Sequence, residues 1–260
     1  MIDREKALKT FNIYVSKYNP EDEKIKLKIE HIQRVAKHAN DIAENLKLSK
    51  GDIDLAWLIG LLHDMGRFEQ VRLYHTFNDG KSVNHAEIGV KILFEDGLIR
   101  EFIEDKQYDE IIKIAILNHN RPAIETGLTE RQLLHSKIIR DADKIDIYYS
   151  LTIYSKEAVW ESKDLSNDII SDEIYREFKE DKRMNYKNRR SAADGLVCHF
   201  AYVYDFNYKY SLQIIDENNY IEKIYKRHSS WKGRSKTSTI YRHYDCTTTW
   251  KPKRTPKLCK

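Results

Sequence analysis

Residues 55–68 read LAWLIGLLHDMGRF, and this stretch decides the fold because an apolar helix ends there in a His-Asp pair. Apolar side chains cover most of the helix circumference, which is typical of a helix buried in a core. We expect Gly66 to end the helix, which places Asp64 in its last turn, where the helix dipole disfavours a carboxylate. His63 and Asp64 therefore need a cationic partner, either a basic side chain or a metal ion.

The length and composition are those of a globular chain. With 260 residues, of which 41% are hydrophobic, it can bury a core without disulfides. The N-terminus MIDREKALKT has no apolar signal region, and no run approaches the roughly 18 apolar residues of a membrane span. We expect a cytoplasmic protein with no membrane partner. The three cysteines form no CxxC pair, so any metal must use histidine and carboxylate ligands.

The net charge of +4 belongs to the C-terminal tail. Residues 229–260 hold nine Lys or Arg and one Asp, which leaves residues 1–228 with a net charge near −4. The tail is also rich in Ser and Thr and has no apolar period, which predicts a disordered or poorly packed segment. The composition therefore allows nucleic-acid binding through this tail only, and not through the folded body.

Helical spacing of apolar residues runs through the rest of the chain and predicts an all-α protein. An amphipathic helix within residues 1–24 precedes a longer one over 25–48. A capping box at Ser49 opens the next helix after a short loop, so these two helices should be antiparallel neighbours. His31, near the start of one, and His63, at the end of the other, then lie at the same end of the pair.

Two more histidines lie at helix ends. Residues 69–81 are polar and are expected to form a loop over the site. The helix after this loop should open at Ser82 and carries His85 in its first turn. An Ile-rich helix then ends in His119, because Pro122 prevents its continuation.

A carboxylate interrupts the buried face of the last long helix. A capping box at Thr129 opens this helix, which should continue to about Val159. Asp143 is spaced by four residues from an isoleucine on either side, so it lies on the buried face and needs a partner. Asp141 and Asp146 point elsewhere and are expected to be solvated or to contact a ligand residue.

Together these positions indicate a metal site. Imidazole and carboxylate groups without thiolate suit Fe, Mn, Co, Ni or Zn in sites with more than four ligands. Two ions bridged by one carboxylate could polarise a phosphoryl oxygen and generate hydroxide, and Asp64 is the natural bridge. The candidate ligands are His31, His63, Asp64, His85, His119 and Asp143.

The pattern H…HD…H…H…D resembles the HD-domain superfamily of metal-dependent phosphohydrolases over about residues 25–160. His31 matches the first His, and Asp143, in the stretch DADKID, matches the closing Asp. The resemblance implies one ion on His31, His63, Asp64 and Asp143, and a second on Asp64, His85 and His119. Position 119 is a lone His rather than a His-His pair, so one or two ions remain open.

The resemblance also implies the fold and the phosphate ligands. We expect a compact multi-helix bundle with the metal site between helix ends, forming one domain over residues 1–228 with a helical extension from residue 161. Arg67, in HDMGR, occupies a position where relatives often carry a basic residue near the substrate phosphate. Its fork can bind two phosphate oxygens, and Lys144 is a second candidate.

The leading functional hypothesis is a hydrolase that uses metal-activated hydroxide to cleave a phosphate ester or anhydride of a nucleotide or small phosphorylated metabolite. One alternative is a nuclease or phosphodiesterase acting on single-stranded nucleic acid, for which deletion of residues 229–260 should weaken binding. Another is a non-catalytic metal-binding sensor or interaction domain. No Gly-Tyr-Pro motif follows, so cyclic dinucleotide specificity is not implied, and the sequence does not name the metal or the oligomeric state.

Overall fold

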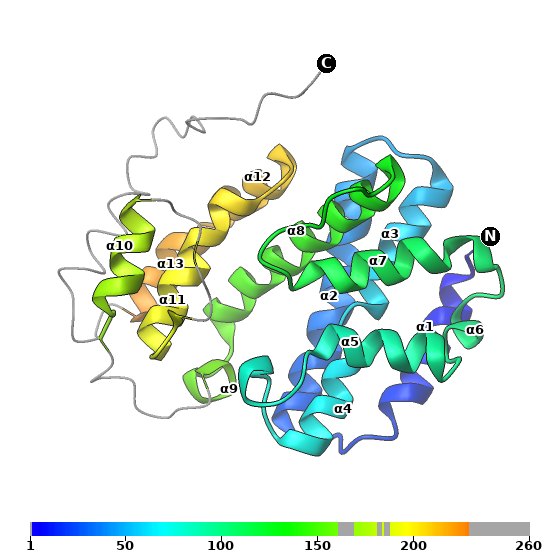
Figure 1. Ribbon diagram of the computed structural model, residues 1–260, viewed down its shortest axis with the longest axis horizontal. Coiled ribbons are helices and arrows are strands. Elements are labelled where there is room, and N and C mark those ends of the chain that lie inside the picture. Colours follow the sequence, from blue (N-terminus) through cyan, green and yellow to red (C-terminus); the bar gives the residue numbers. More distant parts are fainter. Residues whose placement is uncertain (1, 161–168, 181–183, 185–187, 229–260) are drawn as a thin grey trace.

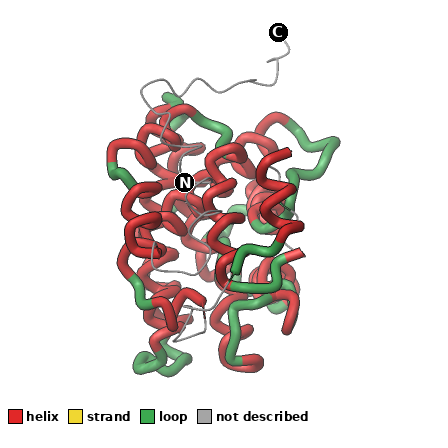
Figure 2. Tube along the Cα trace, turned by 90° about the vertical axis from the view of Figure 1, so that its left-hand side faces the viewer, coloured by secondary structure: helices red, strands yellow, loops and turns green. Residues whose placement is uncertain are grey.

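A computed structural model describes residues 2–160, 169–180, 184 and 188–228, and all regular structure in this part of the chain is helical (Figure 2). The predicted all-α class is confirmed. The basic tail at 229–260 lies outside the described residues. None of the described helices is both long enough and apolar enough to cross a membrane.

The helices form two groups along the chain, with α8 running between them (Figure 1). The first group comprises α1 (Arg4–Val15), α2 (Glu23–Asn45), α3 (Lys50–Leu62), α4 (Met65–Tyr74), α5 (His85–Val90), α6 (Ile99–Phe102), α7 (Asp109–His119) and α8 (Glu130–Ile153). The second comprises α9 (Lys156–Trp160), α10 (Asp172–Glu180), α11 (Ala192–Ala201), α12 (Lys209–Glu217) and α13 (Tyr220–His228). Short turns supplement them: η1 (Asp79–Lys81), η3 (Lys106–Tyr108) and η5 (Tyr202–Asp205) are 3-10 helical, and η2 (Lys91–Glu95) is π-helical.

The helices α2, α3 and α8 pack against one another and form the centre of the first group. The close approach of α2 and α3 depends on Gly60, because a Cβ atom there would lie 2.6 Å from Cα of Ala36. The short connection predicted between α2 and α3 is present, and Ser49 caps α3 by accepting a hydrogen bond from the amide of Asp52. His31 and His63 lie at the same end of this pair, with ring centroids 5.4 Å apart.

The structure differs from the prediction after the His-Asp pair. Gly66 does not end a helix: α3 ends at Leu62, and Gly66 lies in the first turn of α4. A Cβ atom at Gly66 would lie 2.1 Å from the carbonyl oxygen of His85, so this glycine permits the contact between α4 and α5. Asp64 therefore precedes the N-terminus of a helix, where the dipole favours a carboxylate. Residues 69–74, predicted as loop, continue α4.

Two other helix boundaries also differ. The helix predicted from Ser82 begins at His85, because the side chain of Asn84 caps it by accepting from the amide of Ala86. The helix predicted to reach Val159 ends at Ile153, although its capping box at Thr129 is present. Arg227 of α13 donates to the carbonyl oxygens of Thr152 and Tyr154, which provides partners for the last turn of α8.

Candidate metal centre

Six helices bring the six predicted ligand residues into one buried cluster. His31 lies in α2, His63 and Asp64 form the junction between α3 and α4, and His85 begins α5. His119 ends α7, and Asp143 lies within α8. The first five of these residues are buried, and the side chain of Asp143 is 17% exposed. Neither a histidine nor a carboxylate of the predicted set is left outside the cluster.

One half of the cluster surrounds the Oδ2 atom of Asp64. This oxygen lies 3.4 Å from Nε2 of His31 and 3.5 Å from Nε2 of His63. Oδ1 of Asp143 faces the same two nitrogens, at 3.2 Å from His31 and 3.8 Å from His63. Two imidazoles and two carboxylates thus converge on one small volume.

The other half surrounds the Oδ1 atom of Asp64. This oxygen lies 3.2 Å from Nε2 of His85 and 3.7 Å from Nε2 of His119. The two ring nitrogens are 2.9 Å apart, within hydrogen-bond distance of each other. The two oxygens of Asp64 therefore face two different pairs of histidines, as a bridging carboxylate would.

Every histidine of the cluster uses its Nδ1 atom outside the cluster. Such contacts fix the ring orientation and leave the Nε2 lone pair for a ligand, which is the usual arrangement of histidines that bind metals. The partners are Asp146 for His31 (2.6 Å), the carbonyl oxygen of Gly60 for His63 (2.8 Å), Asp79 for His85 (2.7 Å) and the carbonyl oxygen of Ile116 for His119 (2.6 Å).

Unpaired polar atoms support a metal site. Nε2 of His31, Nε2 of His63 and Oδ1 of Asp64 are buried, and none of the contacts that they make in the described part of the chain has the geometry of a hydrogen bond. Buried polar atoms without partners are costly, and a divalent cation would satisfy all three. The chemistry of the donor set, imidazole nitrogen and carboxylate oxygen, suits such an ion.

Charges around the cluster set the protonation of its members. Burial lowers the pKa of His63 to about 3, so this imidazole is neutral and can act as a ligand. Burial opposes ionisation of Asp64, but the positive charge of Lys28 outweighs it and holds the pKa of this carboxyl group well below its ordinary range. His31 differs: burial and Lys28 lower its pKa, but contacts with Asp143, Asp146 and Asp64 outweigh them and raise it to about 10. For His31 to bind a metal ion, its imidazole would therefore have to lose a proton.

Two residues beside the cluster, Lys28 and Asp79, were not predicted to act there. Lys28 lies one turn before His31 on α2, and its Nζ atom is 2.7 Å from Oδ2 of Asp64. The one feature of the sequence that points to Lys28 is its position three residues before His31. Asp79 follows Asn78 in a predicted turn, and nothing else in the sequence indicated a role for it at the site. Asp146 was predicted to be solvated or to contact a ligand residue, and it is buried and contacts His31.

Asp141 was predicted to be solvated or to contact a ligand residue, and it does neither. Its side chain is buried and accepts hydrogen bonds from the amides of Asn207 and Tyr208 and from the hydroxyl of Ser211. It therefore fixes the start of α12 against α8 and is not part of the cluster.

The two predicted phosphate ligands lie in different surroundings. Arg67 is at the rim: its Nε is 3.6 Å from Oδ1 of Asp64, and its Nη1 donates to Asp79 and to the carbonyl oxygen of Phe77. Lys144 instead pairs with Asp205, at 2.6 Å, in the second group of helices.

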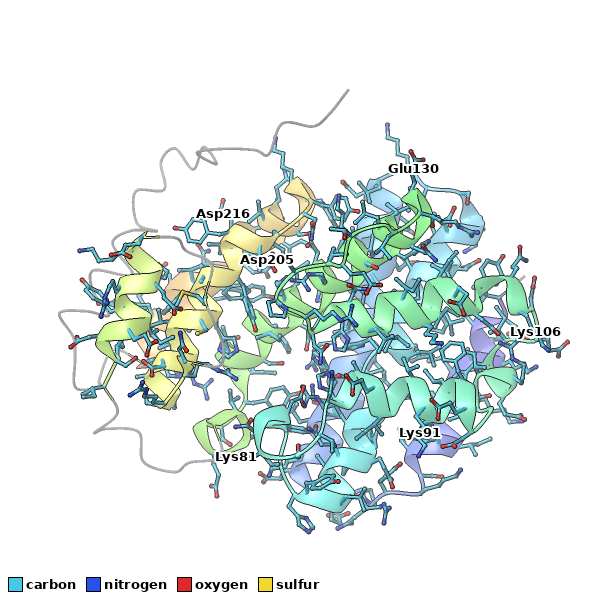
Figure 3. All side chains as sticks on the ribbon, viewed as in Figure 1. Lys81, Lys91, Lys106, Glu130, Asp205 and Asp216 are labelled. Carbon is cyan, nitrogen blue, oxygen red and sulfur yellow. The ribbon has the colours of Figure 1, made fainter. Side chains whose placement is uncertain are left out.

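Figure 3 shows Asp205 where the two groups of helices meet. Its carboxylate also accepts a hydrogen bond from Arg140, at 2.8 Å. Arg140 in turn donates to the carbonyl oxygen of Asn118, beside His119. This shared ion pair fastens the second group to the last turn of α7 and to α8.

Comparison with known proteins identifies the central part of the chain. Residues 29–148 match the model of the family described as HD domain. This range runs from α2 to α8 and contains all six residues of the cluster together with Arg67 and Lys144. No curated protein and no solved structure was found to match the chain.

Proposed function

The chain belongs to the HD-domain superfamily through residues 29–148, and on that premise we propose that it hydrolyses a phosphate ester or anhydride of a nucleotide or small phosphorylated metabolite. This superfamily is one of metal-dependent phosphohydrolases. The single observation that carries the proposal is the position of Asp64, whose two oxygens face two separate pairs of histidines.

The proposed ligands form two sets that share Asp64. His31, His63 and Asp64, with Asp143 facing both histidines, would hold one divalent cation, and Asp64, His85 and His119 would hold a second. The metal would be Fe, Mn, Co, Ni or Zn, which accept imidazole and carboxylate donors. When bound, such ions supply Lewis acidity toward phosphoryl oxygens and lower the pKa of water.

The side chains around the cluster would position the substrate. Arg67 is held by Asp79, by the Phe77 carbonyl oxygen and by Gln70, so its guanidinium is fixed at the rim and can orient an incoming phosphate. Lys144 would contribute a second positive charge only if Asp205 released it. Burial of the cluster strengthens each of these electrostatic interactions because it limits screening by water.

Metal content and phosphate release test the proposal together. We would purify wild-type protein without chelators, measure metals by plasma mass spectrometry, and screen phosphate esters and anhydrides for release of phosphate. We expect about two equivalents of metal in the wild type and about one in His85→Ala. Asp64→Ala should lose both metal and turnover while keeping its helical circular dichroism spectrum.

His135→Ala is the matched control, because His135 is equally buried but contacts Asp52 at the other end of α3. It should keep its metal and its activity. Full hydrolytic activity in Asp64→Ala would overturn the proposal, and so would a wild-type protein that binds no divalent cation.

A further inference from the structure

Lys28 reaches into the cluster from helix α2 and contacts Asp64, the carboxylate shared by both halves of the cluster. Its Nζ atom lies 2.7 Å from Oδ2 of Asp64, the oxygen that also faces His31 and His63. Its side chain is only 14% exposed. The ammonium group therefore sits at an atom that the proposed first metal ion would use.

Two positive charges cannot both be accommodated well at this oxygen. Asp64 is 3% exposed, and repulsion between like charges is strong where water is scarce. A divalent cation on Oδ2 of Asp64 must therefore compete with the ammonium of Lys28. The lysine side chain can yield, because four rotatable bonds connect its charge to the backbone at the rim of the cluster.

The surroundings of Lys28 limit where its charge can go. Nζ lies 5.3 Å from the centroid of the Phe77 ring, and the guanidinium of Arg67 lies 5.7 Å from the same ring. Arg67 also approaches the other oxygen of Asp64, at 3.6 Å. Lys28 and Arg67 thus flank both Asp64 and Phe77, and a displaced Lys28 would remain beside Arg67 at the mouth of the cluster.

We propose that Lys28 exchanges partners: it neutralises Asp64 when no divalent cation is bound, and it binds an oxyanion beside the metal site when one is. The oxyanion is a phosphoryl group of the substrate, and in this respect the inference rests on the proposed function. Lys28 and Arg67 would then hold the oxyanion from two sides. The anion site exists only after metal loading, so metal and anion binding are coupled.

Binding measurements test the exchange without any turnover. Mn²⁺ affinity is measured by titration calorimetry for the wild-type chain, Lys28→Met and Lys26→Met. Lys26 is exposed on the same helix, so its substitution makes the same change in net charge away from the cluster. We expect Lys28→Met to bind Mn²⁺ about tenfold more tightly than the wild type, because a charge-assisted hydrogen bond no longer competes. Lys26→Met should match the wild type.

The second measurement uses inorganic phosphate on the Mn²⁺-saturated proteins. Lys28→Met should bind phosphate about tenfold more weakly than the wild type, while Lys26→Met should not differ from it. Wild-type protein without Mn²⁺ should bind phosphate as weakly as Lys28→Met does. Lys28→Arg, which keeps the charge, should retain both wild-type affinities.

An unchanged Mn²⁺ affinity in Lys28→Met would overturn the exchange, and so would an unchanged phosphate affinity with Mn²⁺ present. Failure of the proposed function has a different signature. If both binding results are as expected but no phosphate ester or anhydride is hydrolysed, the exchange stands and the hydrolase proposal does not.

Discussion

Nδ1 of His31 lies 2.6 Å from Oδ2 of Asp146, a carboxylate on the same helix as Asp143. Helix α8 thus provides both a proposed metal ligand and the group that orients another. Arg34 donates to both oxygens of Asp146, at 2.5 and 3.1 Å, and its guanidinium lies 4.8 Å from the centroid of the Tyr149 ring. The orientation of His31 is therefore fixed by a chain of contacts that reaches to the edge of the protein.

Substitution of Asp146 should weaken metal binding without removing a ligand. We expect Asp146→Asn to lower the affinity for Mn²⁺ by about 10- to 100-fold, because His31 loses its charged acceptor. Titration calorimetry measures the affinity. Asp141→Asn makes the same change at a buried carboxylate of α8 that contacts residues 207–211, and it should lower the melting temperature but leave the Mn²⁺ affinity unchanged. Equal affinities in the two variants would contradict this role of Asp146.

Gly66→Ala should disturb both stability and the second half of the cluster. The added methyl group would lie 2.1 Å from the carbonyl oxygen of His85 and 2.6 Å from the amide nitrogen of Gly89, so α5 must move. We expect a loss of about 1–3 kcal/mol in the free energy of unfolding, measured in urea, and a lower metal content.

Gly51→Ala serves as the control for this substitution. Gly51 is also helical, but a Cβ atom there would have its nearest contact at 3.9 Å, with Ser49. This change should stabilise the protein by about 0.5–1 kcal/mol. If the two variants proved equally stable, the close approach of α5 would not be what requires glycine at position 66.

Asp205→Asn tests the assignment of Lys144 to the substrate. Lys144 and Arg140 are buried and share the Asp205 carboxylate, so this substitution frees their charges for another anion. If Lys144 binds substrate phosphate, KM should fall about tenfold in steady-state assays, since a competing anion is gone. Asp216→Asn, an exposed carboxylate on α12, is the charge-matched control. An unchanged KM in Asp205→Asn would exclude Lys144 from substrate binding.

Asp52 should contribute to stability in a defined pH range. Partial burial raises its pKa, but hydrogen bonds from Arg131, His135 and Ser49 outweigh this and lower the pKa to about 2. An aspartate in an unfolded chain titrates near pH ~3.9, so the stabilisation is fully present above that value and is lost as the pH falls toward about 2. Urea unfolding from about pH 6 to about pH 2 should show the wild type losing its advantage over Asp52→Asn across this range. A constant difference between them would refute the prediction.

The members of the cluster could be singled out from the sequence because they interrupt otherwise apolar helical patterns. His63 and Asp64 follow an apolar helix, His119 ends another, and Asp143 interrupts a buried face. Periodicity identifies such positions from the sequence alone, since it depends only on neighbours along the chain. For His31 and His63, the common location also followed from the sequence, because the short connection between their helices makes the two helices antiparallel.

The errors concern contacts between distant segments. Gly66 was interpreted as a helix end, but it is required by the approach of α5, which the local sequence does not encode. Asp141 and Asp146 were placed off the buried face because one covered face was assumed for α8. This helix is covered on several sides, by α2, α7, α12 and α13, so carboxylates on other faces are buried too.

Lys28 was missed for another reason. A lysine three residues before a histidine on an amphipathic helix is common on solvated faces, and only the position of Asp64 gives it a role. The packing of two helices decides which residue contacts a carboxylate on the neighbouring helix. The periodic pattern of one helix cannot predict that contact.

The six side chains of the cluster come from helices that are distant in the sequence, so the complete donor set exists only in the folded chain. An ion that requires this set binds the native state and not the unfolded one. The native state then gains about 1.4 kcal/mol for each tenfold excess of ion over its dissociation constant. The rise in melting temperature on addition of each cation therefore ranks the cations by their affinity for the protein, and it can be measured before any substrate is known.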